Sequence, residues 1–156
     1  MAAGEKVNVA YLGGSITEGY LVNIRKNYAY KTMSWMREFF GNDRIIYNNA
    51  GLSGTSSTIG LLRVQQDVLD KAPDLVFVEF AVNDGNDSTS RMMYESLVKR
   101  LLTSETAPAV VLIFTVLESG YTCEEHMLEV GRAFELPMIS VNAALAPELA
   151  AGAQEE

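Results

Sequence analysis

The chain alternates between short, almost continuous apolar segments and longer segments in which apolar residues recur every three or four positions. The short segments are rich in β-branched and aromatic residues, which predicts strands at 7–12, 45–48, 74–80, 109–115 and 137–141. The longer segments predict amphipathic helices at 28–40, 57–71, 90–103 and 122–135. In the first helix, the large apolar residues at helical spacing are expected in the core or an interface: Met33, Trp35, Met36, Phe39 and Phe40.

This alternation predicts an α/β protein with a five-stranded parallel sheet. Strands that are apolar along their whole length are buried on both faces, and a parallel sheet achieves this with helices on both sides. Right-handed crossovers favour a three-layer, flavodoxin-like sandwich, for which we expect the strand order 2-1-3-4-5. The Ala-rich tail from residue 143 predicts a short helix or a frayed end.

Composition narrows the class of protein. The chain has 156 residues, 48% of them hydrophobic, so we expect one domain over 1–156 with a single core. Its formal net charge of −8 disfavours nucleic acid and an anionic membrane surface as partners. Its one cysteine, Cys123, excludes an internal disulfide. No secretion signal or membrane-spanning run is visible, so we expect a cytoplasmic location unless a signal peptide has been removed.

The first predicted strand ends in a turn that carries a serine, in LGGSITEG (residues 12–19). In a doubly wound sheet, ligands bind beyond the carboxyl ends of the strands, where the strand order reverses. Ser15 is therefore expected to present its hydroxyl to a crevice. Taken alone, the motif fits a nucleophile, a plain turn or a helix cap.

Two further loops change this interpretation. Gly54 follows the second strand in NAGLSGTSS (residues 49–57), and Asn83 follows the third in EFAVNDGN (residues 79–86). A serine hydroxyl, a glycine backbone N–H and an asparagine amide would then converge from adjacent loops. This combination predicts a nucleophile with an oxyanion hole, although each loop alone also fits an ordinary turn.

Together the three motifs resemble the signature blocks of the SGNH hydrolases, also called GDSL-type esterases and lipases, in the GGSIT form of many bacterial members. In this resemblance Ser15 matches the nucleophile, and Gly54 and Asn83 match the oxyanion donors; Ala81 replaces the usual glycine of the third block. The resemblance covers residues 7 to about 141. It implies an esterase without metal or organic cofactor, acting on an ester of a carbohydrate or another small alcohol, such as an acetate.

The family's fourth block, D-x-x-H, does not occur in this sequence. In the family its histidine is the general base and its aspartate orients that histidine. We therefore expect a chain that is truncated at its C-terminus relative to the family and impaired as an enzyme by itself. A binding or assembly module and an acyltransferase remain alternative functions. A missing closing helix would also expose apolar surface, which a second copy of the chain could cover, or the tail residues Leu145, Pro147 and Leu149.

Three other titratable residues are candidates for the missing base. His126, the only histidine, lies in the helix after the fourth strand. Two strand spacings separate that strand from the first, roughly 10 Å, whereas a general base needs contact at about 3 Å. We expect a structural role for His126, with catalysis as the alternative. Asp84 and Asp87 are nearer, but a solvated carboxylate is a poor base, and Asp84 is expected to make hydrogen bonds within its loop.

Overall fold

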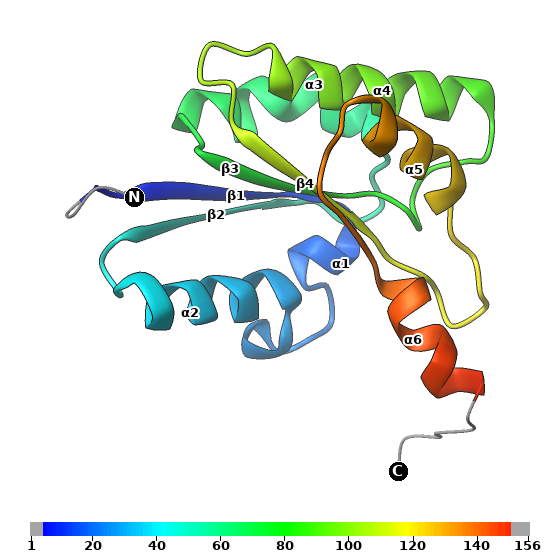
Figure 1. Cartoon of the computed structure of the whole chain (residues 1–156), viewed down its shortest axis with the longest axis horizontal. Helices are drawn as coiled ribbons and strands as arrows, with labels where there is room; N and C mark the ends of the chain where they lie inside the picture. The colour runs from blue at the N-terminus through cyan, green and yellow to red at the C-terminus, as the bar shows by residue number, and fades with distance from the viewer. Residues whose placement is uncertain (1–4, 151–156) are drawn as a thin grey trace.

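Five parallel strands form one sheet at the centre of the molecule (Figure 1). The computed structural model describes residues 5–150, with side chains described up to residue 146. The strand order is β2-β1-β3-β4-β5, which confirms the expected order. The strands are β1 (Val7–Gly13), β2 (Ile45–Gly51), β3 (Leu75–Glu79), β4 (Ala109–Phe114) and β5 (Met138–Ser140).

Helices cover both faces of the sheet, as the alternation predicts. In Figure 1, α3, α4 and α5 lie on one face and α1 and α2 on the other, while α6 extends beyond the end of β5. The helices are α1 (Ser15–Glu18), α2 (Tyr28–Phe40), α3 (Ser57–Asp67), α4 (Ser88–Leu102), α5 (Glu124–Ala133) and α6 (Val141–Ala150), with short 3-10 turns η1 (Ile24–Lys26) and η2 (Leu69–Lys71).

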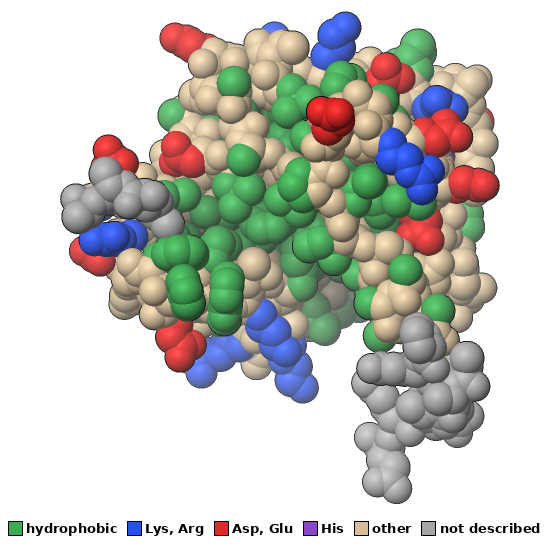
Figure 2. Space-filling view, in the orientation of Figure 1, with side chains coloured by type: hydrophobic (Ala, Val, Ile, Leu, Met, Phe, Trp, Pro, Cys, Tyr) green, Lys and Arg blue, Asp and Glu red, His purple; other side chains and the backbone are tan. Residues whose placement is uncertain are grey.

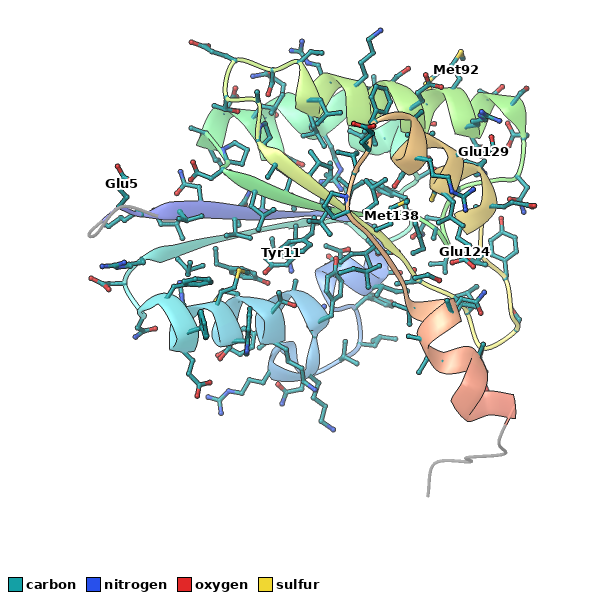
Figure 3. The ribbon with its side chains drawn as sticks, viewed as in Figure 1. Glu5, Tyr11, Met92, Glu124, Glu129 and Met138 are labelled. Carbon is teal, nitrogen blue, oxygen red and sulfur yellow. The ribbon has the colours of Figure 1, made fainter. Side chains whose placement is uncertain are left out.

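The side chains of β1 show why the core has two halves. Successive residues of a strand point to opposite faces, so Leu12 joins the larger cluster under α3, α4 and α5, whereas Tyr11 joins the smaller cluster with Met33 and Met36 of α2. The Tyr11 ring stacks on Phe77 with ring centroids 4.9 Å apart. Figure 3 shows Tyr11 between the sheet and α2. Burial on both faces confirms the interpretation of the continuous apolar strands.

Capping side chains set the starts of the two long helices. Asn27 accepts hydrogen bonds from the backbone N–H groups of Ala29 and Tyr30 at the start of α2. Asp87 does the same for Thr89 and Ser90 at the start of α4. Such caps satisfy backbone donors that have no partner within the helix.

The aromatic residues of α2 do not all enter the core. Met33 and Met36 are buried, but Trp35 is 58% exposed and Phe39 is 70% exposed. Neither aromatic therefore lies in the core, and the alternative, a place in an interface, remains a prediction. Residues 35 and 39 are one helical turn apart on the outer face, where their rings stack with centroids 5.6 Å apart.

The expected apolar surface is present beside the sheet. Hydrophobic side chains gather across the face shown in Figure 2, between α2 and α6. Ile139 of β5 is 49% exposed and Leu145 of α6 is 39% exposed. Pro147 and Leu149 lie outside the residues whose side chains are described. Association of two copies remains a prediction.

Candidate active site

Ser15 lies at the carboxyl edge of the sheet, as the first residue of α1, directly after the end of β1. Its side chain is partly exposed. Its carbonyl oxygen accepts hydrogen bonds from Gly19 N at 2.9 Å and Tyr20 N at 3.1 Å, which close the short helix. Ser15 also borders a surface hollow of about 340 Å³, whose other lining residues are Ile16, Tyr20, Val22, Lys26, Asn27 and Tyr28.

The two glycines before Ser15 are required by close packing. A Cβ on Gly13 would overlap the Thr17 hydroxyl, and a Cβ on Gly14 would overlap the Asn83 side chain. Gly14 has φ −88°, outside the left-handed region, and the contact with Asn83 leaves no space for a Cβ. The paired glycines let side chains approach the start of α1 from two sides.

Asn83 lies in the turn that follows β3, where its backbone N–H donates to the Phe80 carbonyl at 2.9 Å. Its side chain contacts Gly14, the residue before Ser15. The Asn83 Oδ1 atom is buried and has no hydrogen-bond partner among the described residues. The structure thus brings the predicted asparagine to the start of α1.

Gly54 lies in the loop between β2 and α3. It is exposed and has φ +71°, and nothing lies within 4 Å of the position that a Cβ would take. Two hydrogen bonds join this loop to residues 12–19, the segment that contains Ser15. Leu52 N donates to the Gly13 carbonyl at 3.0 Å, and Ser53 N donates to the Glu18 carboxylate at 3.0 Å. Gly54 is therefore at the same edge of the sheet as Ser15 and Asn83.

A buried polar network lies beneath α1, and the sequence motifs did not reveal it. Thr17 is fully buried and donates to Glu79 Oε2 at 3.0 Å, and its hydroxyl lies 2.9 Å from the Tyr28 hydroxyl. Thr115 donates to the other oxygen, Glu79 Oε1, at 2.7 Å. Burial raises the pKa of Glu79, against the opposing effect of these hydrogen bonds. The available signal was a glutamate at the end of an otherwise apolar strand.

Two asparagines complete the attachment of α1. Asn27 Nδ2 donates to the Ile16 carbonyl at 2.8 Å, and Asn49 Nδ2 donates to the Thr17 carbonyl at 2.9 Å. Carbonyls at the end of a short helix have no partner within that helix. Asn27, which caps α2, and Asn49 of β2 therefore supply the hydrogen-bond donors that these carbonyls lack within α1.

Asp84 is buried, with 4% of its surface exposed, so the expectation of a solvated carboxylate is wrong. Its Oδ1 accepts a hydrogen bond from Ser57 N at 2.7 Å, at the start of α3, and its carbonyl oxygen accepts one from the Tyr121 hydroxyl at 2.6 Å. The expected hydrogen-bonding role is thus confirmed, but across elements and not within one loop. Burial raises the pKa of Asp84. Asp87 is the exposed cap of α4, and hydrogen bonds from Ser90 lower its pKa.

His126 lies on α5 beside α4. Its ring meets the Tyr94 ring edge-on, with centroids 6.5 Å apart, and its Nε2 is buried without a hydrogen-bond partner among the described residues. Burial lowers the pKa of His126, and the charged groups that act on it are Asp84, Arg91, Asp87 and Glu129. These groups belong to α4, α5 and the loop after β3, not to α1. This environment supports the structural role, and the catalytic alternative stays untested.

Two features of the described residues concern cofactors and membranes. Within residues 5–150, no cluster of three or more histidine, cysteine or acidic side chains could hold a metal ion. In the same part of the chain, no helix combines the length and apolar character needed to cross a bilayer. The expectation of a reaction without a cofactor remains a prediction.

The fold and the three loops define a flavodoxin-like α/β sandwich with a serine at the carboxyl edge of its five-stranded parallel sheet. The model of the GDSL-like lipase/acylhydrolase family matches residues 11–151. The chain belongs to this family. No curated protein matches the chain in sequence.

Solved structures agree with this assignment. A two-domain esterase (CEX) active on acetylated mannans is 39% identical over 98% of this chain, with a TM-score of 0.93, and the chain spans 42% of that esterase's length. The SGNH-hydrolase family esterase AlinE4 is 23% identical over 98% of this chain and 85% of its own, with a TM-score of 0.74. A lipase/acylhydrolase from Enterococcus faecalis is 24% identical, covers 90% of this chain and 78% of its own, and has a TM-score of 0.68. The last two likenesses show the SGNH hydrolase fold alone.

Proposed function

We propose that this chain carries the nucleophile and the oxyanion hole of a serine esterase. Ser15 is the nucleophile, and the donors to the developing oxyanion are the N–H groups of Ser15 and Gly54 and the side-chain amide of Asn83. The observation that carries the proposal is the contact between the Asn83 side chain and Gly14, one residue before Ser15. An oxyanion hole needs a preformed donor beside the attacking atom.

The reaction proceeds in two acyl-transfer steps. The Ser15 Oγ attacks the ester carbonyl carbon, and the carbonyl oxygen gains negative charge and is held by the three donors. The tetrahedral intermediate then expels the alcohol and leaves an acyl-serine. Water attacks this acyl group in the second step, which releases the acid and restores Ser15.

Both steps need a proton acceptor for the attacking oxygen. His126 does not fill this role in our proposal, because it faces Tyr94 of α4, and the charged groups that act on it lie on α4, α5 and the loop after β3 and not on α1. Glu79 does not either, because its two oxygens accept hydrogen bonds from Thr17 and Thr115. The described residues therefore supply attack and oxyanion binding without an imidazole at Ser15, and we expect slow turnover by this polypeptide.

The proposed substrate is an acetyl ester of a carbohydrate. The 39% identical two-domain esterase acts on acetylated mannans and has been crystallised with mannopentaose. The net charge of −8 suits a neutral ester better than an anionic one. An acetylated manno-oligosaccharide should compete with p-nitrophenyl acetate for Ser15, whereas the deacetylated oligosaccharide should compete less.

One observation favours a second candidate, a binding module that retains the pocket but does not catalyse. The sequence contains no D-x-x-H motif. Such a module would bind the ester without forming an acyl-serine.

Peptide mapping by mass spectrometry separates the two candidates. After incubation with p-nitrophenyl acetate, the peptide that contains Ser15 should gain one acetyl group in the parent protein and none in Ser15→Ala. Acetylation spread over surface lysines and absent from Ser15 would contradict the esterase proposal.

A further inference from the structure

The position of α1, the short helix that carries Ser15, depends on contacts with other elements. This helix has four residues and no side-chain hydrogen bond at its N-cap. A helix of this length is unstable alone. Its place relative to the sheet is therefore set by the side chains that bind it from other elements.

Among these side chains, Glu79 is the one that links α1 to the middle of the sheet. It is fully buried at the end of β3, level with Gly13 of β1 and Ile113 of β4. One of its carboxyl oxygens binds Thr17 of α1, and the other binds Thr115 after β4. Because Gly13 has no Cβ, the Thr17 hydroxyl can lie beside it and reach Glu79.

Stability alone does not explain an acidic residue at this position. The ion pairs among the described residues are Arg63–Asp67 and Arg91–Glu129, so no cation pairs with Glu79 there. Burying a carboxyl group without a cation costs free energy, and an apolar side chain of similar volume is often more favourable. The hydrogen bonds from Thr17 and Thr115 point instead to a role of the carboxyl group in linking the two segments that carry these threonines.

We propose that Glu79 is a positioning residue that sets the nucleophile against its oxyanion donor, acting through Thr17. Thr17 lies two residues after Ser15, and Glu79 lies four residues before Asn83 on the same segment. The hydrogen bond between Thr17 and Glu79 thus fixes α1 to the end of β3, which leads into the turn that carries the asparagine. This inference rests on the proposed roles of Ser15 and Asn83.

Glu79 acts at a distance from the reacting atoms. Its carboxyl group is fully buried, and both of its oxygens are bound to threonine hydroxyls. Loss of the Thr17 contact should change the alignment of Ser15 and not the affinity for the ester. The expected signature is a lower maximal rate of acetylation at an unchanged half-saturating ester concentration.

Three variants test the proposal: Thr17→Val, Thr17→Ser and, as a matched control, Thr115→Val. Both valine variants remove one hydrogen bond to the Glu79 carboxyl group from a buried threonine, but only Thr17 belongs to α1. Because the Thr17 hydroxyl also contacts the Tyr28 hydroxyl, Tyr28→Phe accompanies them as the control for that second contact. Acetylation of Ser15 by p-nitrophenyl acetate is measured with added imidazole as base, together with the melting temperature. We expect Thr17→Val to lower the maximal rate roughly 10- to 100-fold, and Thr17→Ser and Thr115→Val to stay within about threefold of the parent.

Two outcomes would overturn the proposal: an unchanged rate in Thr17→Val, or an equal loss of rate in the two valine variants.

A second readout does not depend on esterase activity. In a Ser15→Cys background, the alkylation of the new thiol by iodoacetamide is followed by peptide mapping, which separates it from Cys123. Adding Thr17→Val should slow this alkylation at least about threefold, because the thiol leaves its place at the start of the helix, and adding Thr115→Val should not. If the parent protein is not acetylated at Ser15, the proposed function fails, and the alkylation rates still decide the role of Glu79.

Discussion

The Asn83 side chain lies against Gly14 so closely that a single methyl group on Gly14 would overlap it. This contact joins the end of β1 to the loop after β3 at the residue before Ser15. It gives a reason for the glycine at position 14, because a larger residue would overlap Asn83.

A double-mutant cycle tests this contact. We expect Gly14→Ala to lower the free energy of unfolding by about 1–3 kcal/mol, as overpacking typically does. In an Asn83→Ala background the space is vacant, so the same substitution should cost much less. Urea denaturation of the four proteins gives the coupling energy. An equal cost in both backgrounds would show that Gly14 and Asn83 are not in contact.

The second prediction concerns the function of Asn83. Removing one oxyanion donor typically lowers the rate about 10²- to 10³-fold, so we expect Asn83→Ala to slow the acetylation of Ser15 to this extent. Its free energy of unfolding should not fall, because the buried Oδ1 has no hydrogen-bond partner to lose among the described residues.

The matched control is Asn86→Ala, an exposed asparagine of the same loop, which should change neither quantity. A loss of folding stability that accounts for the loss of rate in Asn83→Ala would make Asn83 a structural residue.

The third prediction is the pH dependence of stability at Glu79. Burial raises the pKa of this group above its ordinary value of 4.5, so the folded protein holds the proton more tightly than the unfolded chain. The resulting stabilisation is complete below the ordinary value and is lost as the pH rises through the pKa of the folded state. Glu79→Gln, which keeps a neutral group, should therefore gain stability relative to the parent as the pH rises, by at most about 1.4 kcal/mol per pH unit.

Urea denaturation across the range from about pH 4 to about pH 8 measures this difference. The control is Glu38→Gln, at an exposed position of α2, which removes one acidic side chain outside the core. A flat difference for Glu79→Gln would mean that the Glu79 carboxyl group is as easily ionised in the folded protein as in the unfolded chain.

The fourth prediction separates the two interpretations of His126. If its role is structural, His126→Ala leaves the acetylation rate of Ser15 unchanged, with or without added imidazole. A change in the melting temperature is compatible with this role, because the ring packs against Tyr94. Robust esterase activity that disappears in His126→Ala would instead identify His126 as the base.

The sheet was predictable because the central strands are nearly continuous apolar runs, and right-handed crossovers in a doubly wound sheet favour the strand order that is observed. The edge position of Ser15, Gly54 and Asn83 followed from their place directly after strands. The helix α1 was not predictable, since four residues are too few to show a helical period. The burial of Asp84 was not predictable either, because its polar loop resembles any solvated turn until Ser57 and Tyr121 are seen to bind it.

The hydrogen bonds of Glu79 could not be predicted, because its partners are far away in the sequence. Thr17 and Thr115 lie 62 and 36 positions from it, so no local pattern joins them. The pattern likewise left open whether Trp35 and Phe39 lie in the core or in an interface, because spacing defines a helix face but not which face meets the sheet.

The most direct test of the central claim is the release of p-nitrophenolate from p-nitrophenyl acetate, with imidazole added as an external base, in the parent protein and in Ser15→Ala. The account predicts that the parent exceeds Ser15→Ala, that the excess saturates with ester concentration, and that it grows with imidazole until the base is no longer limiting. Equal rates in the two proteins at every imidazole concentration would contradict the assignment of Ser15 as the nucleophile.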